Sequence, residues 1–311
     1  MIDEGRISNL QSRSGASARK ILVLGGKGFI GRHAVKHLLA AGADVTIGTR
    51  RLSRDSQMPA RQMQLQLHLA LSKSDWLVPA RNFDVILNCV GILRQRWGET
   101  YKAVHHHAPQ AIAQACADHA TRFVHVSALG LSAAAKSRFL TSKFYGEKAI
   151  QVSGADWLLA RISLLDGEGG YGAAWLRGVA KSPLFIVPSS AKGKIAALTA
   201  EDAGRALARL CLAPSESLNV KQSRIFELGG EHSFEFEQYI RGLRTRYASS
   251  PAACIRLPGW LARLGAHVCD VLHFSPFSFG HWELLCRNNV PTPNRLPELL
   301  GEPPERVIQT K

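Results

Sequence analysis

The feature that most constrains the fold is an apolar run followed by three regularly spaced glycines. Residues 21–24 are Ile-Leu-Val-Leu, and Gly25, Gly28 and Gly31 follow at intervals of three. An amphipathic segment, 32–41, comes next. A buried parallel strand, a tight turn and the start of a helix give this order. The free N–H groups and the positive dipole end of such a helix favour a phosphate.

Each glycine has a physical role in a phosphate-binding turn. Gly25 can adopt the unusual dihedral angles of the turn, Gly28 lets the backbone approach a pyrophosphate, and Gly31 lets the helix lie close to the sheet. We predict that Phe29 and Ile30, between the last two glycines, also contact the dinucleotide. The alternative is a glycine-rich loop without a ligand, but the strand–loop–helix context is what a dinucleotide-binding turn requires.

Strand and helix signals alternate along residues 20–165, which predicts an α/β fold with a doubly wound parallel sheet of the Rossmann type. The predicted strands are 20–25, 44–49, 61–71, 84–90, 123–127 and 157–162, of which 61–71 is expected to be half-buried and near the sheet edge. The predicted helices are 109–119 and 139–152.

Residues 166–311 are less regular, and we expect them to complete the sheet and form a small helical lobe on the substrate side. The signals are helices at 175–180 and 199–212, the second capped by Thr199, a strand at 226–229, and an apolar helical cap at 251–285 broken by Pro258 and Pro276. Residues 1–19 are rich in Ser and Arg, so we predict a disordered leader.

Composition limits the partners and the compartment. The net charge of +15, from 39 basic and 24 acidic residues, suits an anionic partner, but the basic residues do not form the stripe with stacking aromatics that is typical of nucleic-acid binding. The six scattered cysteines indicate a reducing compartment rather than disulfides or zinc.

No apolar run is long enough to span a membrane. We expect a cytoplasmic protein, with contact at the inner-membrane surface as the alternative.

The end of the second predicted strand indicates which dinucleotide is bound. An NAD site usually places Asp or Glu there, whereas a 2′-phosphate site prefers Arg. Here Thr49 is followed by Arg50 and Arg51, and the first carboxylate after them is Asp55. Because a guanidinium grips phosphate with a planar fork, we predict NADP(H) rather than NAD(H), with Arg50 as the main contact and Arg51 as the second. The alternative is an exposed basic turn.

Further motifs extend this pattern along the chain. They are residues 25–31, 88–91 (Asn-Cys-Val-Gly), 123–127 (Phe-Val-His-Val-Ser), Lys143 with Gly146 and Glu147, and 159–161 (Leu-Ala-Arg) followed by Gly167. Over residues 20–230 the chain resembles the atypical and extended short-chain dehydrogenase/reductases. Residues 137–143 and 287–290 are similar to the branch that contains the NADPH-binding accessory subunit of respiratory complex I and its bacterial relatives.

The resemblance implies further cofactor contacts and an active site. The implied cofactor contacts are Val90, Gly91, Ser127, Lys143 and Arg161. Lys143 and Ser127 are also the expected catalytic residues, although the family's spacing leaves Leu129 or Ser132 as alternatives for the serine. Where the family usually has proline after this arginine, the chain has Ile162.

One position departs from the family's chemistry. The family reaction needs a tyrosine four residues before the lysine, and Phe139 occupies that position. Tyr145 lies on the other side of Lys143, so water, His105 or Tyr171 stay open as the proton source. Two functions therefore remain: hydride transfer to an apolar carbonyl or quinone-like acceptor, or a non-catalytic NADP(H)-binding structural or assembly module with a protein partner.

Two other features have simple explanations. Residues 105–107 are three consecutive histidines, but consecutive helical side chains point about 100° apart, so they cannot share one ion and we predict no metal site. The aromatic residues in 274–282 are expected to be core or a substrate lid, with peripheral membrane contact as the alternative.

Overall fold

The structure, a computed structural model, describes residues 18–53, 60–248, 250–272 and 277–308. Its centre is a seven-stranded parallel sheet with the order β11-β6-β5-β4-β1-β2-β3. The strands are β1 (Lys20–Leu24), β2 (Asp44–Thr49), β3 (Arg61–Gln64), β4 (Val85–Asn88), β5 (Arg122–Ala128), β6 (Asp156–Ile162) and β11 (Ile225–Leu228). The order reverses between β1 and β4, which confirms the predicted doubly wound fold.

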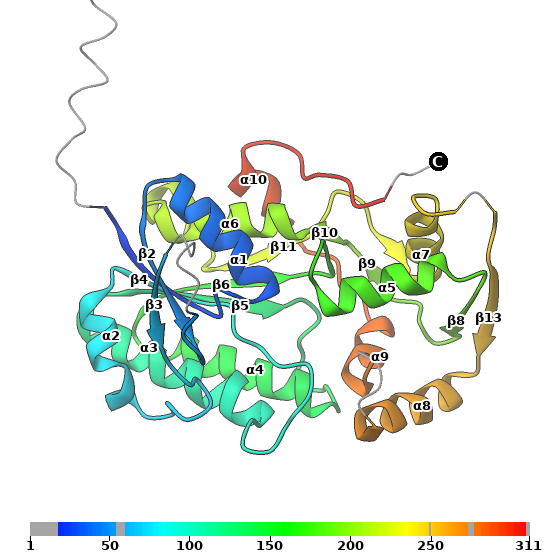
Figure 1. The fold of residues 1–311 in the computed structure, drawn as a ribbon, viewed down its shortest axis with the longest axis horizontal. Coiled ribbons are helices and arrows are strands. Elements are labelled where there is room, and N and C mark those ends of the chain that lie inside the picture. Colours follow the sequence, from blue (N-terminus) through cyan, green and yellow to red (C-terminus); the bar gives the residue numbers. More distant parts are fainter. Residues whose placement is uncertain (1–17, 54–59, 249, 273–276, 309–311) are drawn as a thin grey trace, which may run out of the picture.

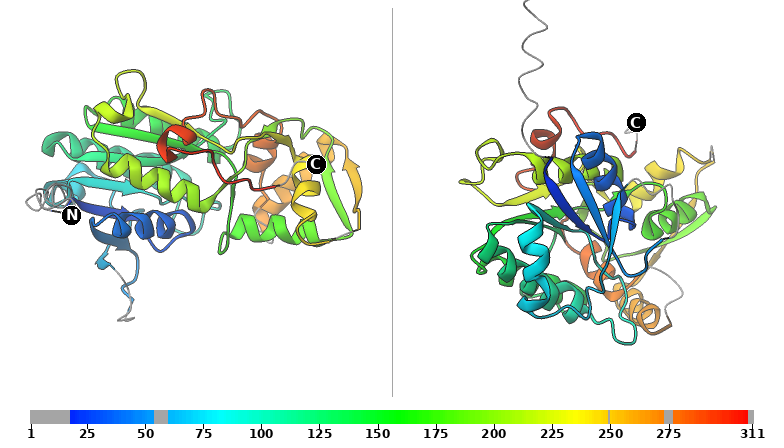
Figure 2. Two further views of the ribbon diagram at one scale, coloured as in Figure 1. Left: turned by 90° about the horizontal axis from the view of Figure 1, so that it is seen from above. Right: turned by 60° about the vertical axis from the view of Figure 1, so that its left-hand side comes forward.

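Helices cover both faces of this sheet (Figures 1 and 2). One face packs against α1 (Phe29–Ala40), α6 (Ala200–Leu212) and α10 (Leu296–Leu300). The other packs against η2 (Lys73–Trp76), α2 (Leu77–Asn82), η3 (Ala103–His107), α3 (Ala108–His119) and α4 (Arg138–Gln151). The two apolar layers explain why the central strands are continuous apolar runs.

A C-terminal lobe lies beside the carboxyl ends of the strands (Figure 1). It contains α5 (Tyr171–Lys181), α7 (Phe236–Arg244), α8 (Gly259–Leu272) and α9 (Phe279–Leu285), with a ribbon of β8 (Leu184–Pro188) and β13 (Ala253–Leu257). Shorter pieces are β7 (Leu165–Asp166), β9 (Lys194–Ile195), β10 (Leu198–Thr199), η4 (Glu216–Leu218) and β12 (Phe234–Glu235). As predicted, the Thr199 side chain caps α6 by accepting from the Asp202 N–H (3.0 Å).

The chain returns from the lobe to the sheet near its C-terminus. The Arg295 N–H donates to the Glu227 carbonyl (2.9 Å), and the Arg295 guanidinium lies 4.1 Å from the centroid of the Phe226 ring. Leu296 and Leu299 of α10 join the core on this side of the sheet. Residues 294–300 therefore cover β11, the edge strand that completes the sheet.

Two predicted elements are present with different bounds: the edge strand is β3, and the helical cap contains α8 and α9. The strand predicted within 61–71 ends at Gln64, because the chain then turns and buries Leu67 against the layer that contains Trp76. The helical cap predicted at 251–285 begins instead with β13, whose residues pair with β8, about 70 positions earlier in the sequence. Pro276 and most of the predicted leader lie outside the described residues. No helix in the described part is long and apolar enough to cross a membrane.

Candidate dinucleotide site and apolar cavity

The glycine turn joins β1 to α1 with the predicted geometry. Gly25 has φ +74°, and the Gly28 N–H donates to its carbonyl (2.8 Å). A Cβ at Gly31 would overlap that same carbonyl, so only glycine lets the helix lie this close to the strand. Gly28 is the N-cap of α1 and offers no capping side chain, and the first turn has no acidic residue. This helix end therefore suits an anion, as a dinucleotide pyrophosphate requires.

Basic side chains gather at the end of β2, beside the glycine turn. Arg50 and Arg51 are exposed, and Lys27 Nζ lies 3.3 Å from the Arg51 carbonyl and 2.6 Å from Gln62 Oε1. Arg50 Nη1 also pairs with Glu99 across the crevice (3.3 Å). Neither Lys27 nor Glu99 has a local signature as a site residue, because their nearness to the end of β2 depends on the fold. The end of β2 is thus surrounded by three positively charged side chains and by one carboxylate, which already pairs with Arg50.

The segment after β4 forms the opposite wall of the glycine turn. Asn88 Oδ1 accepts from the Val90 N–H (3.0 Å), which fixes the direction of the chain as it leaves the strand. A Cβ at Gly25 would touch Val90 Cγ2 at 3.0 Å, and a Cβ at Gly91 would lie 3.8 Å from Lys143 Nζ. Val90 and Gly91 therefore line the passage between the glycine turn and Lys143.

His105 lies in this region, but both of its ring nitrogens are engaged. Its Nε2 accepts from the Ile92 N–H (3.1 Å), so its Nδ1 carries the proton and donates to Ser142 Oγ (3.0 Å). Burial lowers the pKa of His105 well below its usual value, and the positive charge of Lys143 acts in the same direction. This arrangement holds the segment after β4 in place, and the catalytic role of His105 stays a prediction.

Lys143 lies on α4 at the position that the sequence indicates. Burial lowers its pKa to about 8, and the carboxylate of Glu147 opposes this shift. Its Nζ is 5.9 Å from the centroid of the Phe139 ring, one turn earlier on the helix. Tyr145 is exposed and lies beside His106 rather than beside Lys143. Neither Phe139 nor Tyr145 therefore provides a phenol beside Lys143.

Arg161 lies next to Ser127 in the sheet but is held by acidic side chains. Its guanidinium donates to Glu147 (2.6 Å from Nη2 to Oε2) and to Glu227 (3.3 Å). These pairs satisfy its charge within the protein. Contact between Arg161 and a cofactor stays a prediction.

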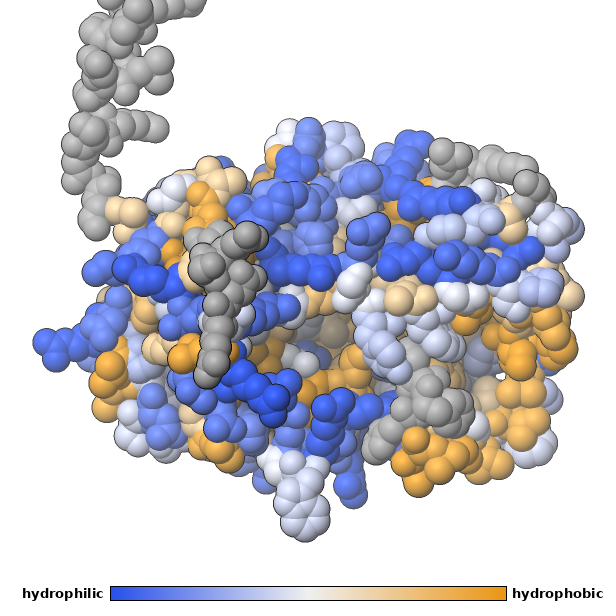
Figure 3. Space-filling model, in the orientation of Figure 1, coloured by the Kyte–Doolittle hydropathy of each residue, from blue (hydrophilic) through white to orange (hydrophobic). Residues whose placement is uncertain are grey.

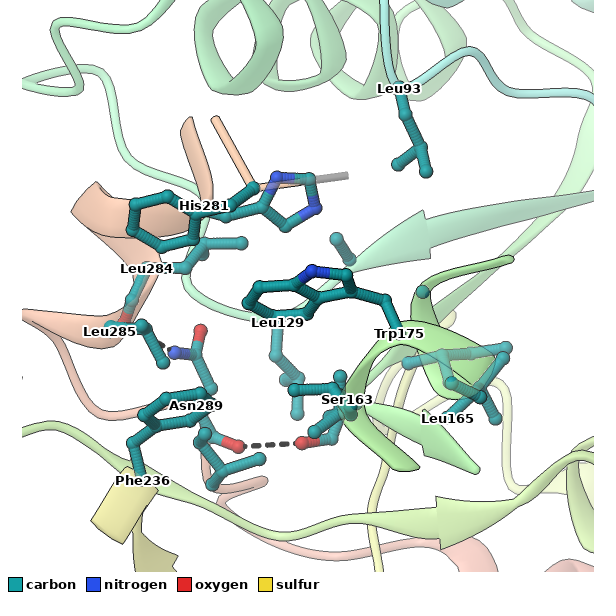
Figure 4. Close-up of a pocket in the computed structure, with 18 of the residues that line it drawn as sticks. Leu93, Leu129, Ser163, Leu165, Trp175, Phe236, His281, Leu284, Leu285 and Asn289 are labelled. Carbon is teal, nitrogen blue, oxygen red and sulfur yellow. Dashed lines mark hydrogen bonds between the residues drawn. The ribbon is translucent and has the colours of Figure 1, made fainter. Parts of the chain in front are cut away.

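A largely apolar cavity of about 340 Å³ opens beside the glycine turn. Figure 4 shows side chains that line it. We call it the apolar cavity. Its walls include Phe29 and Ile30 of α1, Ser127 of β5, Leu129 after β5, Phe139 of α4, Trp175 of α5, and His281 and Leu284 of α9. Ser127 Oγ is buried and has no hydrogen-bond partner among the described residues. An unpaired buried hydroxyl is costly, so its position in this wall suits a polar atom of a bound molecule.

His281 is a functional candidate that the sequence analysis missed. It belongs to α9, and its Nδ1 lies 2.6 Å from Ser278 Oγ, which accepts from the His281 N–H (3.1 Å). The Ser278 hydroxyl can donate to Nδ1, and in that tautomer the proton of the neutral ring is on Nε2. Burial lowers the pKa of His281 to about 4, so the ring is neutral near pH 7. No local motif marks this residue, because only the tertiary fold brings it to the cavity.

No group of three or more His, Cys, Asp or Glu in the described part of the chain is arranged to hold a metal ion. Among the three consecutive histidines, His105 is buried, whereas His106 and His107 are partly exposed and lie against each other (4.9 Å between ring centroids).

Solved structures share this fold. A nucleoside-diphosphate-sugar epimerase from Staphylococcus aureus aligns with a TM-score of 0.70 and 14% identity over 92% of this chain and 97% of its own. MoeE5, solved with UDP-glucuronic acid and NAD, aligns with a TM-score of 0.63 and 15% identity over 92% and 94%. At these identities the similarity establishes the Rossmann architecture alone.

Sequence comparison gives a closer relationship. The chain is 31% identical over 163 residues to the rat protein NADH dehydrogenase [ubiquinone] 1 alpha subcomplex subunit 9, mitochondrial. The match covers 50% of this chain and 43% of the rat protein, so it spans less than half of that relative. A family model described as NAD(P)H-binding matches residues 25–182, just over half of the chain, including the glycine turn, Lys143 and Ser127. The chain therefore belongs to this NAD(P)H-binding family.

Proposed function

We propose that this protein is an NADP(H)-dependent oxidoreductase that acts on an apolar carbonyl or quinone-like acceptor. The observation that carries the proposal is the position of the apolar cavity. Phe29 and Ile30, the first residues of the anion-binding helix, form one of its walls, and Ser127 and His281 contribute polar atoms to others. A dinucleotide held at the glycine turn and an acceptor held in the cavity would be neighbours.

The residues around the glycine turn fit the cofactor. The uncapped start of α1 would hold the pyrophosphate, and Arg50, Arg51 and Lys27 would hold the 2′-phosphate. Lys143 would hold the ribose hydroxyls near the nicotinamide. When bound, NADPH would supply a hydride to the acceptor.

The protein's own residues would orient the acceptor. The apolar walls exclude water and favour a hydrophobic molecule over a sugar nucleotide. His281 Nε2–H and Ser127 Oγ–H can each donate a hydrogen bond to a carbonyl oxygen, and a neutral imidazole can polarise a carbonyl in this way. His281 would thus supply the donor that Phe139 lacks.

A second function is favoured by Phe139 itself. Without the tyrosine hydroxyl the usual proton relay is absent, and the rat relative is named as a subunit of NADH dehydrogenase. The alternative is therefore a non-catalytic NADP(H)-binding module that stabilises or helps assemble a respiratory or other complex.

Calorimetry with NADPH and NADH, followed by NADPH oxidation in the presence of menadione, tests these functions in order. The proposal expects tighter binding of NADPH than of NADH, and turnover with this small apolar quinone. Tight NADPH binding without turnover on menadione or on apolar aldehydes would favour the binding module. Failure to bind either dinucleotide would contradict both.

A further inference from the structure

Helix α8 carries its large apolar side chains on the outside. Trp260, Leu264, Val268, Val271 and Leu272 are between 44% and 76% exposed. The residues that it buries against the lobe are small, namely Ala262 and Ala266. A helix of a globular protein normally has the opposite arrangement, with large apolar residues facing the core. The outward residues recur every three or four positions and so form one stripe along the helix.

The neighbouring ribbon extends this stripe. Leu184 and Ile186 of β8 and Ile255 of β13 are each about half exposed, and Ile186 pairs directly with Ile255 in the sheet register. Figure 3 shows hydrophobic residues gathered along the side of the molecule that carries the ribbon and α8, at the right and lower right of the view. We call this surface, made of the α8 stripe and the three ribbon residues, the apolar face. A contiguous exposed surface of this kind indicates an interaction site.

Basic residues outnumber acidic ones around the apolar face, although Arg256 pairs with Glu237 (3.0 Å) and Lys192 with Glu235 (3.8 Å). Residues 181–194 contain three lysines and no acid, and residues 253–272 contain two arginines and one histidine. The one acid in these segments, Asp270, is turned inward, where it pairs with Arg94 (2.5 Å) and accepts from the Phe279 N–H (3.0 Å). A face with apolar side chains, a tryptophan and a basic surround complements an anionic lipid surface.

We propose that the apolar face binds the surface of an anionic lipid bilayer, with α8 lying in the plane of the interface. At 14 residues α8 is about 21 Å long, which suits a helix that lies on a membrane. A second copy of the chain is a poorer occupant, because a symmetric contact would bring Arg263 and its basic neighbours against themselves. The proposal is independent of hydride transfer, since none of the residues of the apolar face lines the apolar cavity.

Co-sedimentation of the full chain with vesicles tests this proposal. Wild type should sediment with phosphatidylcholine vesicles that contain phosphatidylglycerol, and binding should weaken with added salt and with pure phosphatidylcholine. The double substitution W260S/L264S should lower the partition coefficient at least about tenfold, since each side chain gains from leaving water. The matched control is W97S, which removes a fully exposed tryptophan from the loop between β4 and η3 and should leave partitioning unchanged.

Several results would overturn the proposal. They are no sedimentation of wild type, equal sedimentation with neutral vesicles, or equal losses for W260S/L264S and W97S. A concentration-dependent dimer in analytical ultracentrifugation that W260S/L264S abolishes, without vesicle binding by wild type, would assign the face to a second copy instead. NADPH binding by each variant is measured in parallel, so a folding defect or a failure of the proposed function is recognised separately.

Discussion

The imidazole of His281 stacks on the ring of Phe139, with centroids 5.8 Å apart and planes inclined by 26°. One residue comes from α4 of the sheet domain and the other from α9 of the C-terminal lobe. The contact places a hydrogen-bonding side chain beside Phe139, the position at which the family resemblance implies a tyrosine. Phe139 and His281 lie 142 positions apart in the sequence. Whether this protein catalyses a reaction therefore depends on whether His281 can replace the hydroxyl that Phe139 lacks.

Replacing Arg50 should weaken NADPH binding selectively. In R50A the 2′-phosphate loses a charge-assisted contact, so we expect the Kd for NADPH to rise about tenfold to a hundredfold and the Kd for NADH to stay unchanged. Calorimetry measures both. The matched control is R61A, which removes an exposed arginine paired with Asp44 at the other end of β2. Equal losses for the two cofactors would show that Arg50 does not contact the 2′-phosphate.

Replacing Glu99 should strengthen NADPH binding, whereas replacing Arg50 should weaken it. Its carboxylate pairs with Arg50 and would lie close to a bound 2′-phosphate. In E99Q the arginine is released and a repulsive charge is removed, so NADPH should bind about threefold more tightly while NADH binding stays the same. Titration at low and moderate salt checks the electrostatic origin, because the gain should shrink as salt is added. A weaker affinity for NADPH would contradict this arrangement.

His281 should affect turnover rather than cofactor binding. In H281F the donor at Nε2 is lost while the aromatic contact with Phe139 is kept, so kcat with menadione should fall about a hundredfold. The Kd for NADPH should not change. H267F is the control, because His267 stacks on Phe279 and does not line the apolar cavity. Equal kcat values for H281F and H267F would remove His281 from the mechanism.

Restoring the phenol should raise activity. In F139Y a hydroxyl is placed one helical turn before Lys143, whose charge favours the phenolate, so kcat should rise at least about tenfold if proton delivery limits turnover. Steady-state kinetics at several pH values would detect the new ionisable group as an added pH dependence. Tight NADPH binding with no activity in either form would instead support the structural module.

Stability should fall as the solution is acidified below pH 6.5. Burial lowers the pKa of His125 to about 3 and that of His281 to about 4, so the unfolded chain takes up protons first. The free energy of unfolding should therefore decrease between pH 6.5 and about 3, with a loss of roughly 4 kcal/mol already at pH 5 from the two groups. Urea unfolding at pH 7 and pH 5 measures this loss. H281F should lose the part due to His281 and keep the parts due to His125 and His105, whose pKa burial also lowers. An identical pH dependence in wild type and H281F would contradict the assignment.

The sequence predicted those features whose causes are local. The glycine turn, the buried strands and the capping of α6 by Thr199 each depend on residues within a few positions of one another, and the structure confirms them. The alternating pattern at 61–71 was misleading, because alternation continues past Gln64 while the chain has already turned to bury Leu67. Alternation of polar and apolar residues does not indicate where a strand stops pairing with the neighbouring strand.

The remaining features depend on contacts between distant segments. The pairing of β8 with β13, the approach of Glu99 to Arg50, and the entry of His281 into the cavity wall have no local signature. The Arg50 prediction used only the chemistry expected at the end of a second strand, and so could not include Lys27 or Glu99. The glycine turn could therefore be predicted from sequence, whereas the positions of Glu99 and His281 in the site could not.

The covering of Phe226 by Arg295 has a consequence for how the chain is made. Translation completes the sheet strands and α6 long before residues 294–300 leave the ribosome, so the nascent domain carries β11 with its aromatic core residue uncovered. The sheet is therefore covered on this side only after all of its strands have been synthesised. A protein truncated before residue 294 would keep the glycine turn but would leave strand β11 uncovered.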